Sequence, residues 1–253
     1  MQEVDRISKK EYADKFVGIT PDKLDKLEDR HIKVLEILSK LKAERLLDIG
    51  CGDGNFTMLM ARSCGAKEVY GVDISEKGIE MAKRNGVKAL RVDVDEENLP
   101  FNDNYFDVVT ALEVIEHLFD PDHFLEEVYR VLKPNGIFIL STPNLAAIHN
   151  RIALLFGYQP FPMGVSARMN IGRIYEPDSE HAQSLDHDRV FTLRSLKELL
   201  KIHKFKILEV KGSCAMLPEN MRFRRLFKAV DKIFTVFPSL SYRVVILCQK
   251  KGT

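Results

Sequence analysis

The sequence lacks the features that mark zinc ribbons, thioredoxin-like motifs and membrane-spanning proteins. Its four cysteines, Cys51, Cys64, Cys214 and Cys248, form no Cys-x-x-Cys pair. No apolar run is long enough to cross a bilayer, and the opening stretch MQEVDRISKKEYADKF is too charged for a secretory signal. The formal net charge is only +1, so no global field favours nucleic acid or acidic membranes, although a local patch could. We therefore expect a cytoplasmic protein with reduced thiols.

Short apolar strands alternate with amphipathic helices along most of the 253 residues. Strands are expected at 45–50, 68–74, 87–94, 106–112, 137–144, 205–212 and 242–251. Helices are expected at 21–42, 56–63, 76–85, 121–133, 191–203 and 221–238. This alternation is typical of a parallel sheet covered by helices on both faces. We predict an α/β fold with a doubly wound, mostly parallel sheet.

The regular pattern stops after the fifth expected strand. Residues 145–190 contain glycine, proline, methionine and scattered charge, without a strand–helix repeat. A stretch of this length inside an α/β domain indicates a lid or a substrate-binding insertion. We expect an N-terminal helical segment at 1–43 and a main domain at 44–253 that contains this insertion.

Three glycines lie where the first strand turns into a helix. The segment LLDIGCGDGNFT contains Gly50, Gly52 and Gly54, and glycine at this position lets the backbone approach a ligand closely. A dinucleotide-binding fingerprint would need a further glycine where Asn55 stands, so the loop departs from the NAD pattern. Asp73 ends the second expected strand, where a carboxylate can accept hydrogen bonds from both hydroxyls of a ribose.

An acid also ends the third expected strand. This residue, Asp93, could contact an adenine amino group, and together with the glycine loop and Asp73 it forms a specific combination. The combination resembles the class I S-adenosylmethionine-dependent methyltransferases, closely over residues 44–144 and more loosely beyond them. The resemblance implies a Rossmann-like sheet of seven strands, with S-adenosylmethionine as the cofactor.

The resemblance also implies where the cofactor lies. The glycines would wrap its methionine part, Asp73 would hold the ribose, and Asp93 with its neighbour would frame the adenine. Asp48 would fix either the loop or the cofactor amine. The implied cofactor-binding residues are Asp48, Gly50, Cys51, Gly52, Gly54, Asp73, Ile74, Asp93, Val94, Ala111 and Leu112.

A group of acidic and histidine residues follows the fourth expected strand in the stretch ALEVIEHLFDP. If this stretch is helical, Glu113, Glu116 and His117 fall on one face at i, i+3 and i+4. Two carboxylates and an imidazole suit Mg²⁺, Mn²⁺ or Zn²⁺. A fourth ligand could come from His187, which we favour over His181.

This pattern resembles two groups of enzymes, the metal-dependent small-RNA 2′-O-methyltransferases and the O-methyltransferases of ubiquinone biosynthesis. Both imply that a metal binds the acceptor oxygens and lowers the pKa of the attacking hydroxyl. The alternative is that these residues serve capping, solvation and packing. Without a metal, His117 or His187 becomes the candidate general base.

Several acceptors and partners fit the sequence. We expect O-methylation of a small-molecule or lipid-like acceptor of the quinone type. RNA 2′-O-methylation is an alternative, against which the balanced charge counts. A non-catalytic binding protein is another, against which the intact glycine loop counts. The basic segment MRFRRLFKAVDKIFTVFPSL fits either a helix at a membrane surface or an ordinary helix over the sheet edge.

Overall fold

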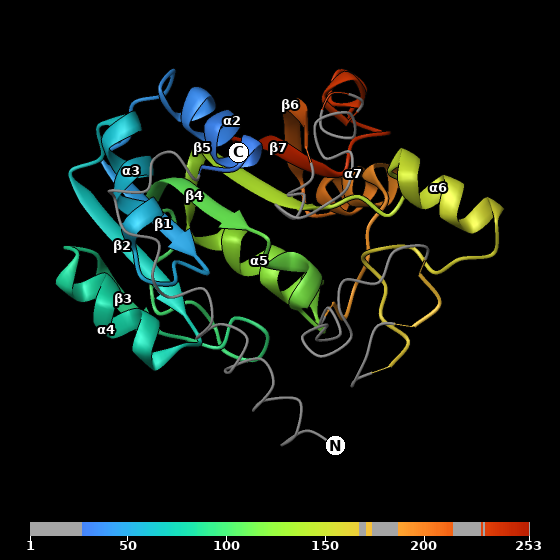
Figure 1. Ribbon diagram of the computed structural model, residues 1–253. Helices are drawn as coiled ribbons and strands as arrows, with labels where there is room; N and C mark the ends of the chain where they lie inside the picture. The colour runs from blue at the N-terminus through green and yellow to red at the C-terminus, as the bar shows by residue number, and fades with distance from the viewer. Residues whose placement is uncertain (1–26, 167–170, 174–186, 215–228, 230, 253) are drawn as a thin grey trace.

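A computed structural model describes residues 27–166, 171–173, 187–214, 229 and 231–252. Within these residues the strands form one sheet of seven in the order β3-β2-β1-β4-β5-β7-β6 (Figure 1). Neighbouring strands are parallel, except that β7 runs antiparallel to β5 and β6. The strands are β1 (Arg45–Ile49), β2 (Glu68–Asp73), β3 (Lys88–Arg91), β4 (Phe106–Leu112), β5 (Leu132–Pro143), β6 (Phe205–Ser213) and β7 (Arg243–Lys250). The predicted fold class is confirmed.

Helices cover both faces of this sheet. They are α2 (Asp29–Leu38), α3 (Asn55–Cys64), α4 (Glu76–Arg84), α5 (Pro121–Val131), α6 (Ile148–Leu155) and α7 (Leu193–Ile202). Because successive strand residues point to opposite faces, neighbours in β1 enter different cores. Leu46 packs in the core that contains residues of α2, α3 and α4, whereas Leu47 packs in the core that contains residues of α5 and α7. None of the described helices is long and apolar enough to cross a membrane.

Some local expectations are wrong. Strand β3 ends at Arg91, so Asp93 follows the strand instead of ending it. Strand β5 begins at Leu132 and not at the expected residue 137, and it contains a bulge where Asn135 has a φ of 65° and the register with β4 shifts. The expected N-terminal helix and the helix at 221–238 lie partly outside the described residues, as does the insertion at 145–190.

The fold brings the ends of its central strands together. Ile49, the last residue of β1, is paired with Val72 on one side and with Ala111 on the other. The chain segments that leave β1, β2 and β4 therefore begin side by side at one edge. Ligands of open α/β sheets bind at this carboxyl edge.

Candidate active site

The glycine loop connects β1 to α3 at the carboxyl edge. Gly50, Gly52 and Gly54 have φ angles of 74°, 52° and 76°, a region that favours glycine. A Cβ atom on Gly50 would lie 2.6 Å from Cγ2 of Val114, and one on Gly54 would lie 2.8 Å from Cγ2 of Val87. The loop is therefore held both by backbone conformation and by close packing.

Asp73 fixes the loop from the neighbouring strand. Its Oδ2 accepts a hydrogen bond from the backbone N–H of Gly52 at 2.8 Å, and its Oδ1 accepts one from Ser75 at 2.8 Å. The Ser75 hydroxyl then caps α4 by accepting a hydrogen bond from the N–H of Gly78 at 3.0 Å. Both oxygens of this carboxylate are thus held in place at the end of β2.

Asp48 joins three elements beneath the loop. It is 5% exposed and accepts hydrogen bonds from the hydroxyls of Thr57 in α3, at 2.5 Å, and of Thr110 in β4, at 2.6 Å. Burial raises the pKa of Asp48 to about 6, against the effect of these two hydrogen bonds. These contacts join β1 to α3 and β4, whereas a role of Asp48 in fixing the loop or the cofactor amine stays a prediction.

The other predicted cofactor-binding residues surround the same edge. Cys51 is buried in the loop, Ile74 directly follows β2, and Ala111 and Leu112 end β4. Asp93 and Val94 follow β3, and Oδ1 of Asp93 accepts a hydrogen bond from the N–H of Asp95 at 3.2 Å. The part of the cofactor that each residue would contact stays a prediction.

The stretch after β4 is not the α-helix that the sequence suggested. Glu113 has a φ of 57°, and a short 3-10 helix, η2 (Ile115–His117), follows. The i, i+3, i+4 face therefore does not form, and Glu113 does not share a helical face with Glu116 and His117. The reason is the tight turn at the end of β4, where the N–H of Glu113 still donates to the carbonyl of Ser141 in β5.

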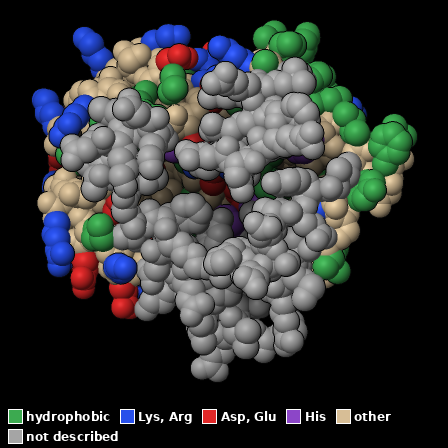
Figure 2. All heavy atoms as spheres, viewed as in Figure 1, with side chains coloured by type: hydrophobic (Ala, Val, Ile, Leu, Met, Phe, Trp, Pro, Cys, Tyr) green, Lys and Arg blue, Asp and Glu red, His purple; other side chains and the backbone are tan. Residues whose placement is uncertain are grey.

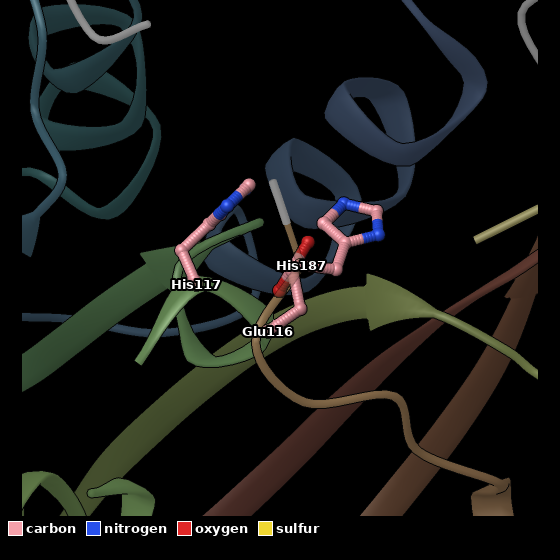
Figure 3. Close-up of side chains that lie close together, drawn as sticks. All are labelled: Glu116, His117 and His187. Carbon is pink, nitrogen blue, oxygen red and sulfur yellow. The ribbon is translucent and has the colours of Figure 1, made fainter. Parts of the chain in front are cut away.

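Three of the four predicted metal ligands nevertheless meet. Glu116, His117 and His187 each offer a ligand atom, and these atoms all lie within 4.8 Å of one another (Figure 3). We call these three residues the Glu–His cluster. The segment that carries His187 is held beside Glu116, because the N–H of Arg189 donates a hydrogen bond to the carbonyl of Glu116 at 3.0 Å. Nδ1 of His187 lies 2.9 Å from the carbonyl oxygen of Pro162.

The carboxylate of Glu116 lies in an unfavourable environment. Glu116 is 2% exposed, and within the described residues neither carboxylate oxygen has a hydrogen bond of normal geometry. Burial raises the pKa of Glu116 well above its usual range, and the Glu113 carboxylate raises it further. Burial lowers the pKa of His187 to about 4, so its imidazole is neutral at pH 7. A buried carboxylate that has, among the described residues, only the poorly aligned Thr142 hydroxyl as a nearby side-chain donor, and that lies beside a neutral imidazole, fits a cation between them.

Glu113 instead belongs to a network of ion pairs. Its Oε2 lies 2.6 Å from Nε of Arg243, its Oε1 lies 3.6 Å from Nη1 of Arg30, and the Ser141 hydroxyl donates to Oε1 at 2.8 Å. Burial alone would raise the pKa of Glu113, but the two guanidinium groups outweigh it and hold that pKa below its usual range. Glu113 therefore lies outside the Glu–His cluster, and His181 lies outside the described residues.

Sequence reasoning missed both arginines of this network. Arg243 begins β7 and also pairs with Glu28 at 2.8 Å. The available signal was an isolated basic residue at the start of an apolar strand.

Viewed from outside, acidic and histidine side chains are visible between the undescribed residues drawn in grey (Figure 2).

Comparisons with known proteins show which sequences and folds the chain is similar to. Residues 47–140 match the methyltransferase domain family. The ubiquinone biosynthesis O-methyltransferase of Pelagibacter ubique is 37% identical over 133 residues, which cover 50% of this chain and 55% of that protein. The enzyme of the same name from Rickettsia prowazekii is 29% identical over 201 residues, covering 75% of this chain and 72% of that protein. The chain thus spans little more than half the length of the first relative.

Solved structures show the same fold at lower identity. A methyltransferase structure from Aquifex aeolicus superimposes with a TM-score of 0.56 and 18% identity, covering 96% of this chain and 97% of that one. At this identity the likeness concerns the fold alone, and the family rests on the sequence match, the glycine loop and the acid that ends β2. Residues 47–140 thus match a methyltransferase domain, and the chain is similar to S-adenosylmethionine-dependent methyltransferases.

Proposed function

We propose that the protein transfers a methyl group from S-adenosylmethionine to an oxygen of a small, quinone-type acceptor. The observation that carries the proposal is the position of the Glu–His cluster. It follows β4 at the same edge as the glycine loop, and Val114 of its connecting segment lies against Gly50. The two relatives described above are O-methyltransferases of ubiquinone biosynthesis, which supports both the acceptor atom and the acceptor class.

The donor would lie over the ends of β1, β2 and β4. Gly50, Gly52 and Gly54 would surround its methionine part, and the fixed carboxylate of Asp73 would accept hydrogen bonds from the ribose hydroxyls. Asp93 and Val94 would contact the adenine. Rigid placement of the donor matters because methyl transfer requires the acceptor oxygen, the methyl carbon and the sulfur in line.

The acceptor hydroxyl would lie at the Glu–His cluster. Glu116, His117 and His187 fit a divalent cation because the carboxylate has no other normal partner among the described residues and the His187 imidazole is neutral. When bound there, such a cation would supply Lewis-acid stabilisation of an acceptor oxygenate. In its absence, the histidines would position the hydroxyl and accept its proton.

Three measurements test this proposal. Calorimetry with S-adenosylmethionine should give a binding isotherm, whereas a scaffold that does not use the cofactor should give no heat. Transfer of a labelled methyl group to catechol, a minimal quinone-type probe, should exceed transfer to a small RNA, and the opposite order would favour the RNA alternative. EDTA should abolish transfer but leave cofactor binding nearly unchanged. Unchanged turnover in EDTA would remove the cation and leave the histidines as base candidates.

A lipid surface is a second candidate partner, proposed from the apolar side chains around α6. Leu154, Leu155 and Phe156 are 56%, 79% and 70% exposed, and Figure 2 shows apolar side chains gathered over this helix. Exposed apolar side chains gathered on one helix favour binding at a membrane surface. Sedimentation with vesicles that contain anionic lipid should retain the wild type and release Leu155→Glu. Equal retention of the two proteins would count against the lipid contact.

A further inference from the structure

A group of aromatic and basic side chains adjoins the Glu–His cluster and has no part in the proposed chemistry. The His149 ring stacks on Tyr242 with centroids 5.1 Å apart and planes at 26°. The Phe161 ring lies 5.6 Å from the same tyrosine, and the Arg173 guanidinium lies 5.2 Å from the centre of the Phe161 ring. We call these four residues the aromatic–basic cluster.

The two clusters touch through neighbouring residues. Phe161 belongs to the aromatic–basic cluster, and the next residue, Pro162, contacts His187 through its carbonyl oxygen. On the other side, Arg243 lies 5.2 Å from the centre of the Tyr242 ring and pairs with Glu113. A molecule held at the Glu–His cluster would therefore extend naturally toward the aromatic–basic cluster.

Arg173 carries a charge that is not balanced within the described residues. It is 8% exposed, and its recorded hydrogen bond there runs from Nη2 to the carbonyl oxygen of Met163 at 3.3 Å. Its Nε is buried without a partner, and no carboxylate of the described residues lies within ion-pair distance of it. Arg243, by contrast, is paired with carboxylates. A buried guanidinium without a counterion is costly, and an anionic ligand would remove that cost.

His149 presents a second unused polar atom. Its Nε2 is buried and has no hydrogen-bond partner among the described residues. Burial lowers the pKa of His149 to about 4, so the ring is neutral at pH 7 and adds no charge to that of Arg173. The cluster thus combines an apolar aromatic surface, one cation and one neutral polar group.

We propose that the aromatic–basic cluster is an acceptor subsite, in which the aromatic rings contact a planar acceptor and Arg173 binds an anionic substituent such as a carboxylate. The guanidinium has five N–H donors in a planar fork that matches a carboxylate. The inference rests on the proposed function, since that function places the acceptor hydroxyl at the Glu–His cluster. It adds the substituent by which the protein would select its acceptor.

The test compares two probes that differ in charge. The full chain, saturated with S-adenosylhomocysteine, is titrated with 3,4-dihydroxybenzoate and with its neutral isostere 3,4-dihydroxybenzamide. A charge-assisted hydrogen bond predicts that the wild type binds the benzoate about tenfold more tightly. Arg173→Gln should abolish the preference, and Arg173→Lys should keep part of it. Arg151→Gln, which changes an exposed arginine of α6, should leave it unchanged.

Each outcome decides a separate question. Equal binding of the two probes by the wild type, or a preference that survives in Arg173→Gln, would overturn the subsite. Titration of every variant with S-adenosylhomocysteine reports on the donor site independently. If the wild type does not bind that product, the proposed function fails, whereas intact product binding without a carboxylate preference removes the subsite alone.

Discussion

Replacing Glu116 with methionine should make the protein more stable and inactive at the same time. Glu116 is 2% exposed, and neither oxygen has a normal hydrogen bond within the described residues. An unsatisfied buried polar group costs about 1–3 kcal/mol, so an apolar side chain of similar size should raise the free energy of unfolding by about that amount. Urea unfolding in EDTA measures the change, and labelled methyl transfer measures the loss of activity.

The gain should depend on pH in a defined direction. The pKa of Glu116 in the folded protein lies well above the value of 4.5 that it has when unfolded. The folded state therefore holds the Glu116 proton more tightly, and the contribution of Glu116 to wild-type stability falls as the pH rises from about 4.5 toward the folded pKa. The difference between Glu116→Met and the wild type should widen over that range.

A second buried glutamate provides the control. Glu127 is 8% exposed, but it pairs with Arg130 at 2.8 Å and accepts a hydrogen bond from the N–H of Leu99 at 2.7 Å. Glu127→Met should lower the free energy of unfolding by about 1–3 kcal/mol because it leaves these donors without an acceptor. If Glu116→Met destabilises the protein as Glu127→Met does, Glu116 has a structural partner and is not held ready for a ligand.

Three further substitutions test the donor site. Asp73→Ala removes the hydrogen-bond acceptor for the Gly52 N–H and the proposed ribose contact. Calorimetry should therefore show S-adenosylmethionine binding that is weaker by about 1–3 kcal/mol. Unchanged affinity would refute the ribose assignment. Gly50→Ala should weaken S-adenosylmethionine binding more than Gly65→Ala. Both glycines have a positive φ, but only a Cβ at Gly50 would meet Val114. Equal effects of the two substitutions would refute the packing argument. Because the folded pKa of Asp48 is about 6 against an ordinary 3.8, the contribution of this carboxyl to stability should fall as the pH rises from about 4 to about 6. The free energy of unfolding of Asp48→Asn minus that of the wild type should therefore rise over that range in urea titrations, and a constant or falling difference would contradict the assignment.

The sheet and the donor loop were predictable because their signals are local. Alternating apolar strands and helices identified the fold, and the sequence placed Asp73 at the end of β2, although its hydrogen bond with the glycine loop came only from the structure. The segment after β4 was not predictable, since a helical spacing of acids says nothing about the tight turn at Glu113. The ion pair between Glu113 and Arg243 joins residues far apart in the sequence, which no short-range pattern reveals.

The same contrast applies to the candidate acceptor side. His187 was predictable as a residue type that could close a metal site, although its distance from Glu116 came only from the fold. The aromatic–basic cluster carried no sequence signal, because His149, Arg173 and Tyr242 are single residues in three separate segments. Their meaning depends on burial and on missing partners, which are properties of the folded chain.

A crystal structure of the full chain with S-adenosylhomocysteine and Mn²⁺ would test the proposed donor and cation sites together. We expect the ribose hydroxyls on the Asp73 carboxylate, the sulfur directed toward the Glu–His cluster, and an anomalous Mn²⁺ peak between Glu116, His117 and His187. A product bound away from the glycine loop would contradict the donor site. A product at the loop without an anomalous peak between these three side chains would contradict the cation.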